Sequence, residues 1–535
     1  MSQSASRRRT ERLEADRSGP RAPQLSRLLS PDAISPRMQR LAVVALMLVF
    51  VVLRLWLLPG PGLDRTAWKE IDYITISQNY AEGGLNFFYP EVSWPAEEPR
   101  ITPVEFPLVP YAAALVYSIF GFGLLTARFL TLLAFAVVTI YVFRLTKREL
   151  GPLVALVAAA ASIPMALYHP FGRFLHTEPW LVAVSVAGLF HFAAWVESRR
   201  RRDLWLTVVA LSLAFAFKLT ALYLGLPLLW ILWRAHGTRW REYISAIGVL
   251  AATLILPIAW YAWAYHLEVT ELRHFSIFTG HDKMQTLTMI TQSKWWTTML
   301  GRVGVEILGG VIGVILLLAG LVTAIRHKIA GLFFGYVLAV GLFFIIVAEG
   351  NLDAPYRQIT IIPAIAPFVG LGAVACGGLV IRMTRVTRAN AVILGIGLLM
   401  IAGILVQSHV RESPLMLDAN QPWQESKWNF AQRMRDLTPS DSLIVTAGEY
   451  TVHKGGNDLS PVLFYYSHRQ GWILEPDDFD IANVLELVPR GATHLAVLPR
   501  AFEDGVEPML ADISNRYALV YEDGEYLLFD LQVAP

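Results

Sequence analysis

Apolar stretches of about twenty residues recur along most of this chain, and they constrain its fold more than any other feature. A helix needs about that length to cross the hydrocarbon core of a bilayer. Hydrophobic residues make up 55% of the 535 residues and charged residues only 16%, against roughly a quarter charged in ordinary soluble domains. The sequence therefore predicts an all-α polytopic membrane protein with about eleven transmembrane helices. The predicted spans are 41–58, 124–144, 152–169, 179–196, 204–219, 221–234, 244–264, 303–325, 330–348, 358–381 and 389–407.

Every second connection between these spans is rich in lysine and arginine, as is the tail that precedes the first span. Cytoplasmic loops carry such an excess of positive charge. We therefore expect a cytoplasmic N-terminus and an exterior C-terminus. The basic connections are Lys147-Arg148, Arg199 to Arg202, Arg234 to Arg241, Arg326 to Lys328 and Arg382 to Arg388.

The composition also predicts the domain boundaries. Residues 1–40 are rich in arginine, serine and proline, which indicates a disordered cytoplasmic tail, and residues 41–407 form the transmembrane domain. Its first outer loop, 59–123, includes an apolar but short, proline-led segment that we expect to lie in the outer interface. Residues 408–535 alternate short apolar stretches with turns and helical segments, which predicts a small α/β domain outside the membrane. No phosphate-binding fingerprint occurs in that domain.

The first outer loop places two carboxylates two residues apart, in Trp68-Lys69-Glu70-Ile71-Asp72. If this stretch is helical, Trp68 and Asp72 share a face, whereas Glu70 is displaced by about 200°. Asp72 then lies on an otherwise apolar stripe, where a carboxylate either has a partner or serves as a base. The alternative is an ordinary solvated loop carboxylate.

Two further acids lie in the outer connections. Glu105 stands between Pro103 and Pro107, and the proline-restricted backbone there holds it on a stiff segment; it could equally be an interfacial charge that faces water. Glu178 precedes Pro179, so it could also be an ordinary helix-start carboxylate that offsets the helix dipole.

Two cations lie near exterior helix ends. Lys218 interrupts an apolar run, and an intramembrane lysine costs about 2.5–3.5 kcal/mol on insertion scales, so it usually has a partner or a function. Lys218 and Arg357 together could hold a phosphate at the outer face, although each could simply extend toward the interface. The outer loop that contains His281 has the composition of a flexible lid, an acceptor loop or a plain connection. No residues show metal-ligand spacing, so no metal site is predicted.

In this order the motifs resemble those of the GT-C glycosyltransferases, specifically the family 39-like bacterial enzymes related to protein O-mannosyltransferases and lipid A aminoarabinose transferase. The Trp68–Asp72 stretch resembles the first-loop acidic motif, and 106–120 resembles the proline-rich interfacial helix. The resemblance covers about 41–380. The remaining matching motifs are Arg173 to Pro179 (second acidic motif), Phe217-Lys218-Leu-Thr (lysine motif) and Tyr356-Arg357 with Ile362-Pro363-Ala (late motif).

The sequence departs from the family pattern at several places. Many members have adjacent Asp-Glu where this chain has Glu70 and Asp72, and others have Lys-Pro-Pro where it has Glu105-Phe-Pro, which removes a phosphate-binding lysine. The second acidic motif commonly ends in Asp instead of Glu178. Lys218 lacks the Gly-Pro that usually follows shortly after the lysine.

The resemblance implies an inverting enzyme that moves a monosaccharide from a polyprenyl-phosphate donor to a lipid, glycan or protein hydroxyl of the envelope. It implies a bacterial inner membrane, with the reaction at the outer face, no nucleic-acid partner and no required cofactor, although some superfamily members use a divalent metal. Asp72 would be the base, with Glu178 beside it at the catalytic centre. The residues expected to bind substrate are Trp68, Glu70, Glu105, Lys218, His281, Tyr356 and Arg357.

Two other functions remain compatible with the same residues. A transporter or flippase of lipid-linked sugars would also carry buried charges, along a pathway instead of around a reaction centre. Such proteins favour internal repeats and broken helices near the midplane, and the sequence indicates neither. A scaffolding membrane protein whose exterior domain binds cell-wall partners is the third possibility.

Overall fold

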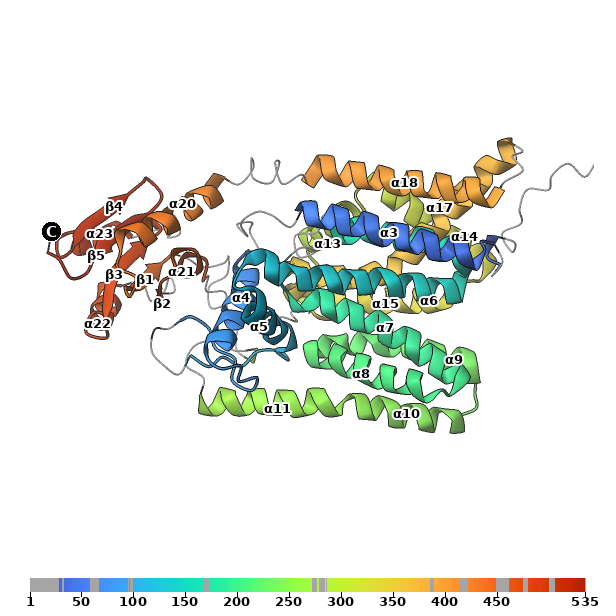
Figure 1. Ribbon diagram of the computed structural model, residues 1–535, viewed down its shortest axis with the longest axis horizontal. Coiled ribbons are helices and arrows are strands. Elements are labelled where there is room, and N and C mark those ends of the chain that lie inside the picture. The colour runs from blue at the N-terminus through green and yellow to red at the C-terminus, as the bar shows by residue number, and fades with distance from the viewer. Residues whose placement is uncertain are drawn as a thin grey trace, which may run out of the picture.

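A bundle of long helices, with a small mixed sheet beyond one end, forms this protein in the computed structural model (Figure 1). The structure describes residues 28–30, 33–57, 67–94, 96, 100–167, 174–271, 277–278, 284, 286–384, 389–412, 422–448, 461–474, 480–499 and 506–534. The predicted class, an all-α polytopic membrane protein with a small C-terminal α/β domain, is confirmed. By length and composition six described helices can cross a membrane, or seven if one bent pair counts as a span.

The first half of the bundle begins with α3, and α6 folds back on itself. Gly151 within α6 has a φ of 82°, which the helical conformation excludes. The hydroxyls of Thr139 and Ser162 lie 3.2 Å apart, although 23 residues of straight helix would separate them by about 35 Å. The two halves of α6 therefore form a hairpin and account for two of the predicted spans. A side chain at Gly151 would collide with the backbone of Leu29. The helices of this half are α3 (Pro36–Leu57), α6 (Leu124–Leu167), α7 (Thr177–Ser198), α8 (Arg201–Phe217), η2 (Leu219–Leu224), α9 (Gly225–His236), α10 (Arg241–Thr253) and α11 (Ile255–Thr270).

The second half is built around α17, which packs against α6, α14 and α18. Gly320 of α14 and Gly372 of α17 face each other so closely that a Cβ on either would collide with the backbone of the other helix. Small residues permit such close helix packing in membranes. Residues 293–307 bend by 99° relative to α14. The elements here are α12 (Thr286–Ile290), α13 (Ser293–Gly301), η3 (Arg302–Ile307), α14 (Val311–His327), α15 (Gly331–Ile346), α16 (Ala348–Asp353), η4 (Pro355–Ile361), α17 (Ile362–Thr384) and α18 (Ala389–Glu412).

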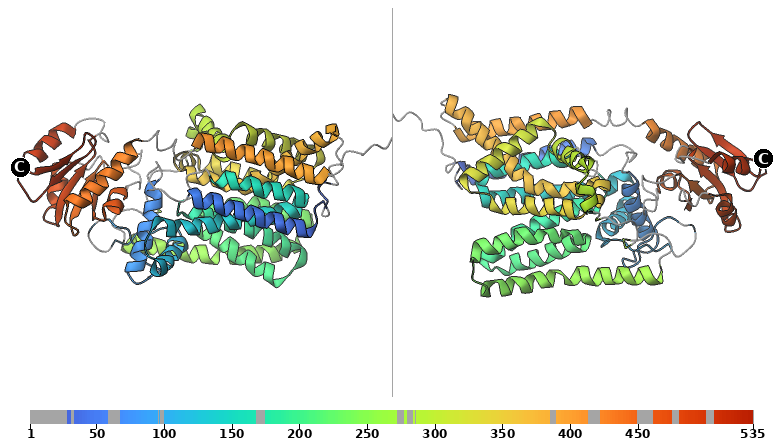
Figure 2. Two further views of the ribbon diagram at one scale, coloured as in Figure 1. Left: turned by 45° about the horizontal axis from the view of Figure 1, so that its top comes forward. Right: turned by 180° about the vertical axis from the view of Figure 1, so that it is seen from behind.

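Two helices of the first outer loop lie at the end of the bundle nearest the C-terminal domain. These are α4 (Ala67–Glu82) and α5 (Leu108–Phe120), which pack against each other. Figures 1 and 2 show both at this end of the bundle, between the long helices and the sheet. At 13 residues α5 is too short to cross a bilayer, as expected for an interfacial helix.

The C-terminal domain is a five-stranded sheet of order β2-β1-β3-β5-β4 with helices around it. β1 pairs in parallel with β2 and β3, whereas β5 pairs antiparallel with β3 and β4. Helix α21 contacts α4, so the domain is packed onto the first outer loop. Its elements are α20 (Pro422–Leu437), β1 (Leu443–Ala447), α21 (Val462–Ser467), β2 (Gln470–Leu474), α22 (Ile481–Leu487), β3 (Ala492–Val497), α23 (Val506–Ser514), β4 (Ala518–Glu522) and β5 (Leu527–Asp530).

Candidate active site

Side chains from four distant segments meet around the ring of Tyr356, in η4. The His176 ring, just before α7, lies 4.6 Å from it between centroids. The Lys218 Nζ lies 4.7 Å from the same centroid, which is within the range of a cation–π contact. Tyr73 of α4 joins the group through the His176 ring at 4.9 Å. The fold thus brings the predicted acidic, lysine and late motifs together at one end of the bundle.

Helix α4 presents its two carboxylates to different neighbours, as the predicted helical phase requires. Both are buried, with Glu70 0% and Asp72 4% exposed, so neither is a solvated loop carboxylate. The Oδ2 of Asp72 lies 3.9 Å from Lys69 Nζ, and Lys69 Nζ lies 5.7 Å from the ring centroid of Tyr73. Lys69 thus lies near both Asp72 and Tyr73, and its charge also acts on His176.

Glu70 points into the bundle and forms a two-pronged ion pair with Arg128 of α6. Arg128 donates to its two oxygens at 2.8 and 2.6 Å, and both side chains are fully buried. The backbone N–H of Leu175 donates to Glu70 Oε1 at 3.1 Å. This arrangement joins α4, α6 and the segment before α7, so the contacts of Glu70 position the site.

Lys218 sits at a break in the helix instead of inside a span. It is the C-cap residue of α8 and has an extended backbone, with φ −156° and ψ 129°. Its Nζ donates to Glu178 Oε1, and His176 Nδ1 contacts the other oxygen of Glu178. Glu178 lies in the first turn of α7, as in an ordinary helix start, yet its carboxylate serves to hold Lys218.

The charges of two carboxylates, Glu105 and Glu178, act on the hydroxyl of Tyr73, which accepts a hydrogen bond from Thr177 at 2.8 Å. Burial raises the pKa of Tyr73 well above its usual value, and the negative charges of Glu105 and Glu178 raise it further. Burial also lowers the pKa of His176, so its ring is neutral near pH 7. Tyr73 and His176 therefore act as neutral hydrogen-bonding groups between the charged side chains.

Glu105 approaches the site on a segment that other elements fix through its backbone. The Val104 carbonyl accepts from Trp260 Nε1 at 3.0 Å, and Phe106 N donates to the Ala216 carbonyl at 3.4 Å. Ala216 is two residues before Lys218. Glu105, which is half-buried, is thus held beside the helix break that carries Lys218.

The guanidinium of Arg357 follows Tyr356 and retains hydrogen-bonding capacity. Within the part of the chain that the structure describes, its Nε and Nη1 are buried and have no hydrogen-bond partner. Buried donors are normally satisfied, so these two point to an anionic ligand. Arg302 of η3 fixes the same turn, because it donates to the Asn351 carbonyl at 2.9 Å, and Gln358 Nε2 donates to that carbonyl at 2.8 Å.

The structure does not describe the side chains of two residues that were expected to bind substrate. The backbone of Trp68 is helical in α4, but its side chain falls outside the described residues, as does all of His281. Among the described residues no group of three or more His, Cys, Asp or Glu side chains could hold a metal ion.

Sequence reasoning missed Arg128, Tyr73 and His176 as parts of this region. Arg128 could have been found, since it stands in the apolar run that begins at Leu124. A charge in such a run calls for a buried partner, by the same logic that singled out Lys218. Tyr73 and His176 carry no comparable signal, because aromatic and histidine side chains are common near membrane interfaces.

Comparison with known structures decides the fold. ArnT from Cupriavidus metallidurans in the apo state superposes with a TM-score of 0.60 at 15% identity, over 92% of this chain and 98% of ArnT. The chain therefore shares the fold of ArnT. The resemblance predicted from the motifs is therefore confirmed.

Other GT-C structures agree with this assignment. The same ArnT bound to undecaprenyl phosphate gives a TM-score of 0.59 at 16% identity, covering 91% of this chain and 97% of ArnT. The Archaeoglobus fulgidus oligosaccharyltransferase in complex with Zn and sulfate gives 0.52 at 12% identity, covering 91% and 73%.

A family model supports the assignment from the sequence side. Residues 101–263 match the dolichyl-phosphate-mannose-protein mannosyltransferase family, a stretch that includes Glu105, Glu178 and Lys218. No curated protein sequence matches the chain. The chain thus matches a mannosyltransferase family over part of its length and shares the fold of ArnT.

Proposed function

We propose that this protein is an inverting glycosyltransferase that moves a monosaccharide from a polyprenyl-phosphate donor to a hydroxyl of an envelope lipid, glycan or protein. The observation that carries the proposal is the pair of buried, unsatisfied guanidinium N–H groups on Arg357 within the described residues. Arg357 and Lys218 both lie against the ring of Tyr356. An ArnT structure of the same fold binds undecaprenyl phosphate. We further propose that the site faces the outside of a bacterial inner membrane, because the basic connections lie toward the other end of the bundle.

In the proposed reaction the acceptor oxygen attacks the anomeric carbon of the donor in one displacement. The bond from that carbon to the phosphate oxygen breaks, and the proton of the acceptor hydroxyl passes to Asp72. The products are the glycosylated acceptor and free polyprenyl phosphate. Inversion follows because the acceptor and the leaving group occupy opposite faces of the sugar.

The chain's cations would stabilise the leaving phosphate as its negative charge grows. Arg357 offers two unsatisfied N–H donors, Nε and Nη1, and charge-assisted hydrogen bonds from a guanidinium to phosphate are strong. Lys218 is held in place by Glu178 and Tyr356, so its positive charge is preorganised beside that of Arg357. Glu178 in this scheme is a positioning carboxylate, and Glu105 is available to bind a sugar or acceptor hydroxyl.

The release of polyprenyl phosphate tests the proposal directly. Full-length protein in detergent or nanodiscs should release polyprenyl phosphate from a polyprenyl-phosphate sugar when envelope extract supplies the acceptor. Mass spectrometry of the extract should then show the same sugar on one acceptor. A protein that moves the intact donor across vesicles and never releases polyprenyl phosphate would instead be a flippase, and the transferase proposal would fall.

Substituting Arg357 should weaken binding of the donor phosphate. We expect Arg357→Gln to raise the Kd for undecaprenyl phosphate at least tenfold, because a hydrogen bond to a charged group contributes about 1.5–3 kcal/mol. The measurement is a titration of the full-length protein with undecaprenyl phosphate. Lys294→Gln removes an exposed cation at the same end of the bundle and should leave the Kd unchanged. Equal Kd values for both variants would remove Arg357 from the phosphate site.

A further inference from the structure

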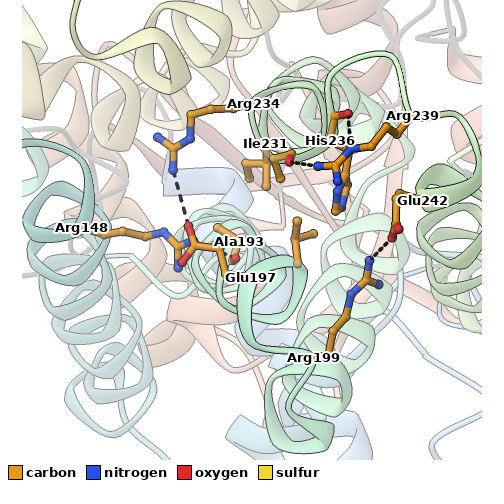
Figure 3. A pocket seen from close by; sticks show the side chains of 11 residues that line it. Arg148, Ala193, Glu197, Arg199, Ile231, Arg234, His236, Arg239 and Glu242 are labelled. Carbon is orange, nitrogen blue, oxygen red and sulfur yellow. Dashed lines mark hydrogen bonds and ion pairs between the residues drawn. The ribbon is translucent and has the colours of Figure 1, made fainter.

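A polar cavity lies at the other end of the bundle from the candidate active site. Its volume is about 420 Å³, and Figure 3 shows arginine side chains from several elements around it. Helix α7 begins at His176 and ends at this cavity, so the two sites lie about 30 Å apart by the length of that helix. The lining residues are Arg148, Ala193, Val196, Glu197, Arg199, Ile231, Arg234, Ala235, His236, Arg239 and Glu242.

The charges that line this cavity leave a positive surplus. Four arginines line it with two carboxylates, Glu197 and Glu242, and a third carboxylate, Glu149, pairs with Arg148 and Arg234. Arg239 donates only to the carbonyls of Ala235 and His236, at 3.0 and 3.1 Å, and within the described part of the chain it contacts no carboxylate. Its positive charge is thus available to an anion that enters the cavity.

The ion pairs at the rim of this cavity can rearrange at little cost. Arg199 donates to Glu242 at 3.1 Å, with side chains 39% and 45% exposed. Exposed pairs of this kind contribute about 0–1 kcal/mol. A phosphate that accepts two guanidinium hydrogen bonds is a stronger partner than such a pair. The cavity can therefore open its rim to a phosphate group.

The surroundings of the cavity fit the depth of a lipid headgroup. Trp233 and Trp240 lie beside it and are 56% and 66% exposed, and exposed tryptophans gather where the membrane meets water. On α9, Leu226, Leu229 and Trp233 recur at helical spacing and are all exposed, which gives an apolar stripe running from the cavity along the bundle. An acyl chain can pack on this stripe while its headgroup occupies the cavity.

We propose that this cavity binds the phosphate headgroup of an anionic phospholipid. The guanidinium groups of Arg239 and Arg234 contact the phosphate, and the acyl chains lie along the exposed face of α9. The site is separate from the candidate active site and does not depend on the proposed transferase reaction.

The test compares lipids and variants of the full-length protein in neutral detergent. Native mass spectrometry with dioleoyl phosphatidylglycerol and dioleoyl phosphatidylcholine gives an apparent Kd for each. We expect the wild type to bind phosphatidylglycerol at least tenfold more tightly, and Arg239→Gln to abolish that preference. Arg239→Lys, which keeps the charge, should retain part of it. Unfolding midpoints measured without lipid show that each variant is folded.

Arg326→Gln provides the matched control, since it removes an exposed arginine from the last turn of α14 that does not line the cavity. It should keep the full preference. The proposal is overturned if Arg239→Gln binds phosphatidylglycerol like the wild type, or if Arg326→Gln loses as much as Arg239→Gln. Displacement of the lipid by inorganic phosphate at matched ionic strength would identify free phosphate as the ligand and also overturn the lipid assignment.

Discussion

Replacing Asp72 by asparagine should lower the rate of sugar transfer by about 10²- to 10⁴-fold, the usual contribution of a general base. The amide has the size of the carboxyl group but cannot accept the proton of the acceptor hydroxyl. Asp72 is 4% exposed and directly precedes Tyr73, which joins the group around Tyr356 through His176, so the loss reports on chemistry at this site. The measurement is release of polyprenyl phosphate by the purified full-length variant.

Binding and folding must stay unchanged for this result to identify a base. The Kd for undecaprenyl phosphate and the unfolding midpoint of Asp72→Asn should match those of the wild type. Glu82→Gln, at the exposed end of the same helix, is the matched control and should transfer at the normal rate. Wild-type transfer by Asp72→Asn would exclude Asp72 as the base and would favour the scaffold or flippase alternatives.

The second large expected effect is a loss of folding stability when Glu70 is replaced. Glu70→Gln should destabilise the helical bundle by about 3–5 kcal/mol, because it removes the negative charge from a fully buried ion pair with Arg128. Chemical unfolding of the full-length protein in detergent measures the loss. Glu242→Gln breaks an exposed pair and should cost only about 0–1 kcal/mol.

A double variant separates the ion pair from simple loss of packing. Glu70→Gln with Arg128→Met removes both charges of the buried pair, so it should be more stable than Glu70→Gln alone, with a coupling between the two sites of about 0.5–3 kcal/mol. If Glu70→Gln were no more damaging than Glu242→Gln, the pair would not hold α4 against α6.

The apolar pattern was sufficient to predict the fold class, since hydrophobic length alone marks the spans. The helical phase of α4 was also predictable: a period of 3.6 residues separates Glu70 from Asp72, and in the structure the two face different partners. The fold-back of α6 was expected from the basic pair Lys147-Arg148 between two apolar runs. These predictions depend only on local periodicity and charge.

The partners of the buried charges were not predictable, because each contact joins segments far apart in sequence. Glu70 meets Arg128 across 58 residues and Glu178 meets Lys218 across 40. Such pairs depend on how helices are rotated against each other, which no local pattern specifies. Lys218 was expected to hold a phosphate together with Arg357, and its carboxylate partner emerged only from the packing of α7 against α8.

The contact between α21 and α4 has a consequence for biosynthesis. Tyr465 of α21 packs against the outer loop, where burial raises its pKa to about 12 and the nearby charge of Glu70 adds to the shift. Residues of α4 leave the ribosome hundreds of residues before Tyr465 does, and domains generally fold in the order of their synthesis. The contact that covers α4 therefore forms only after the C-terminal domain has been made. A chain that terminates early should insert its helices yet leave α4 uncovered.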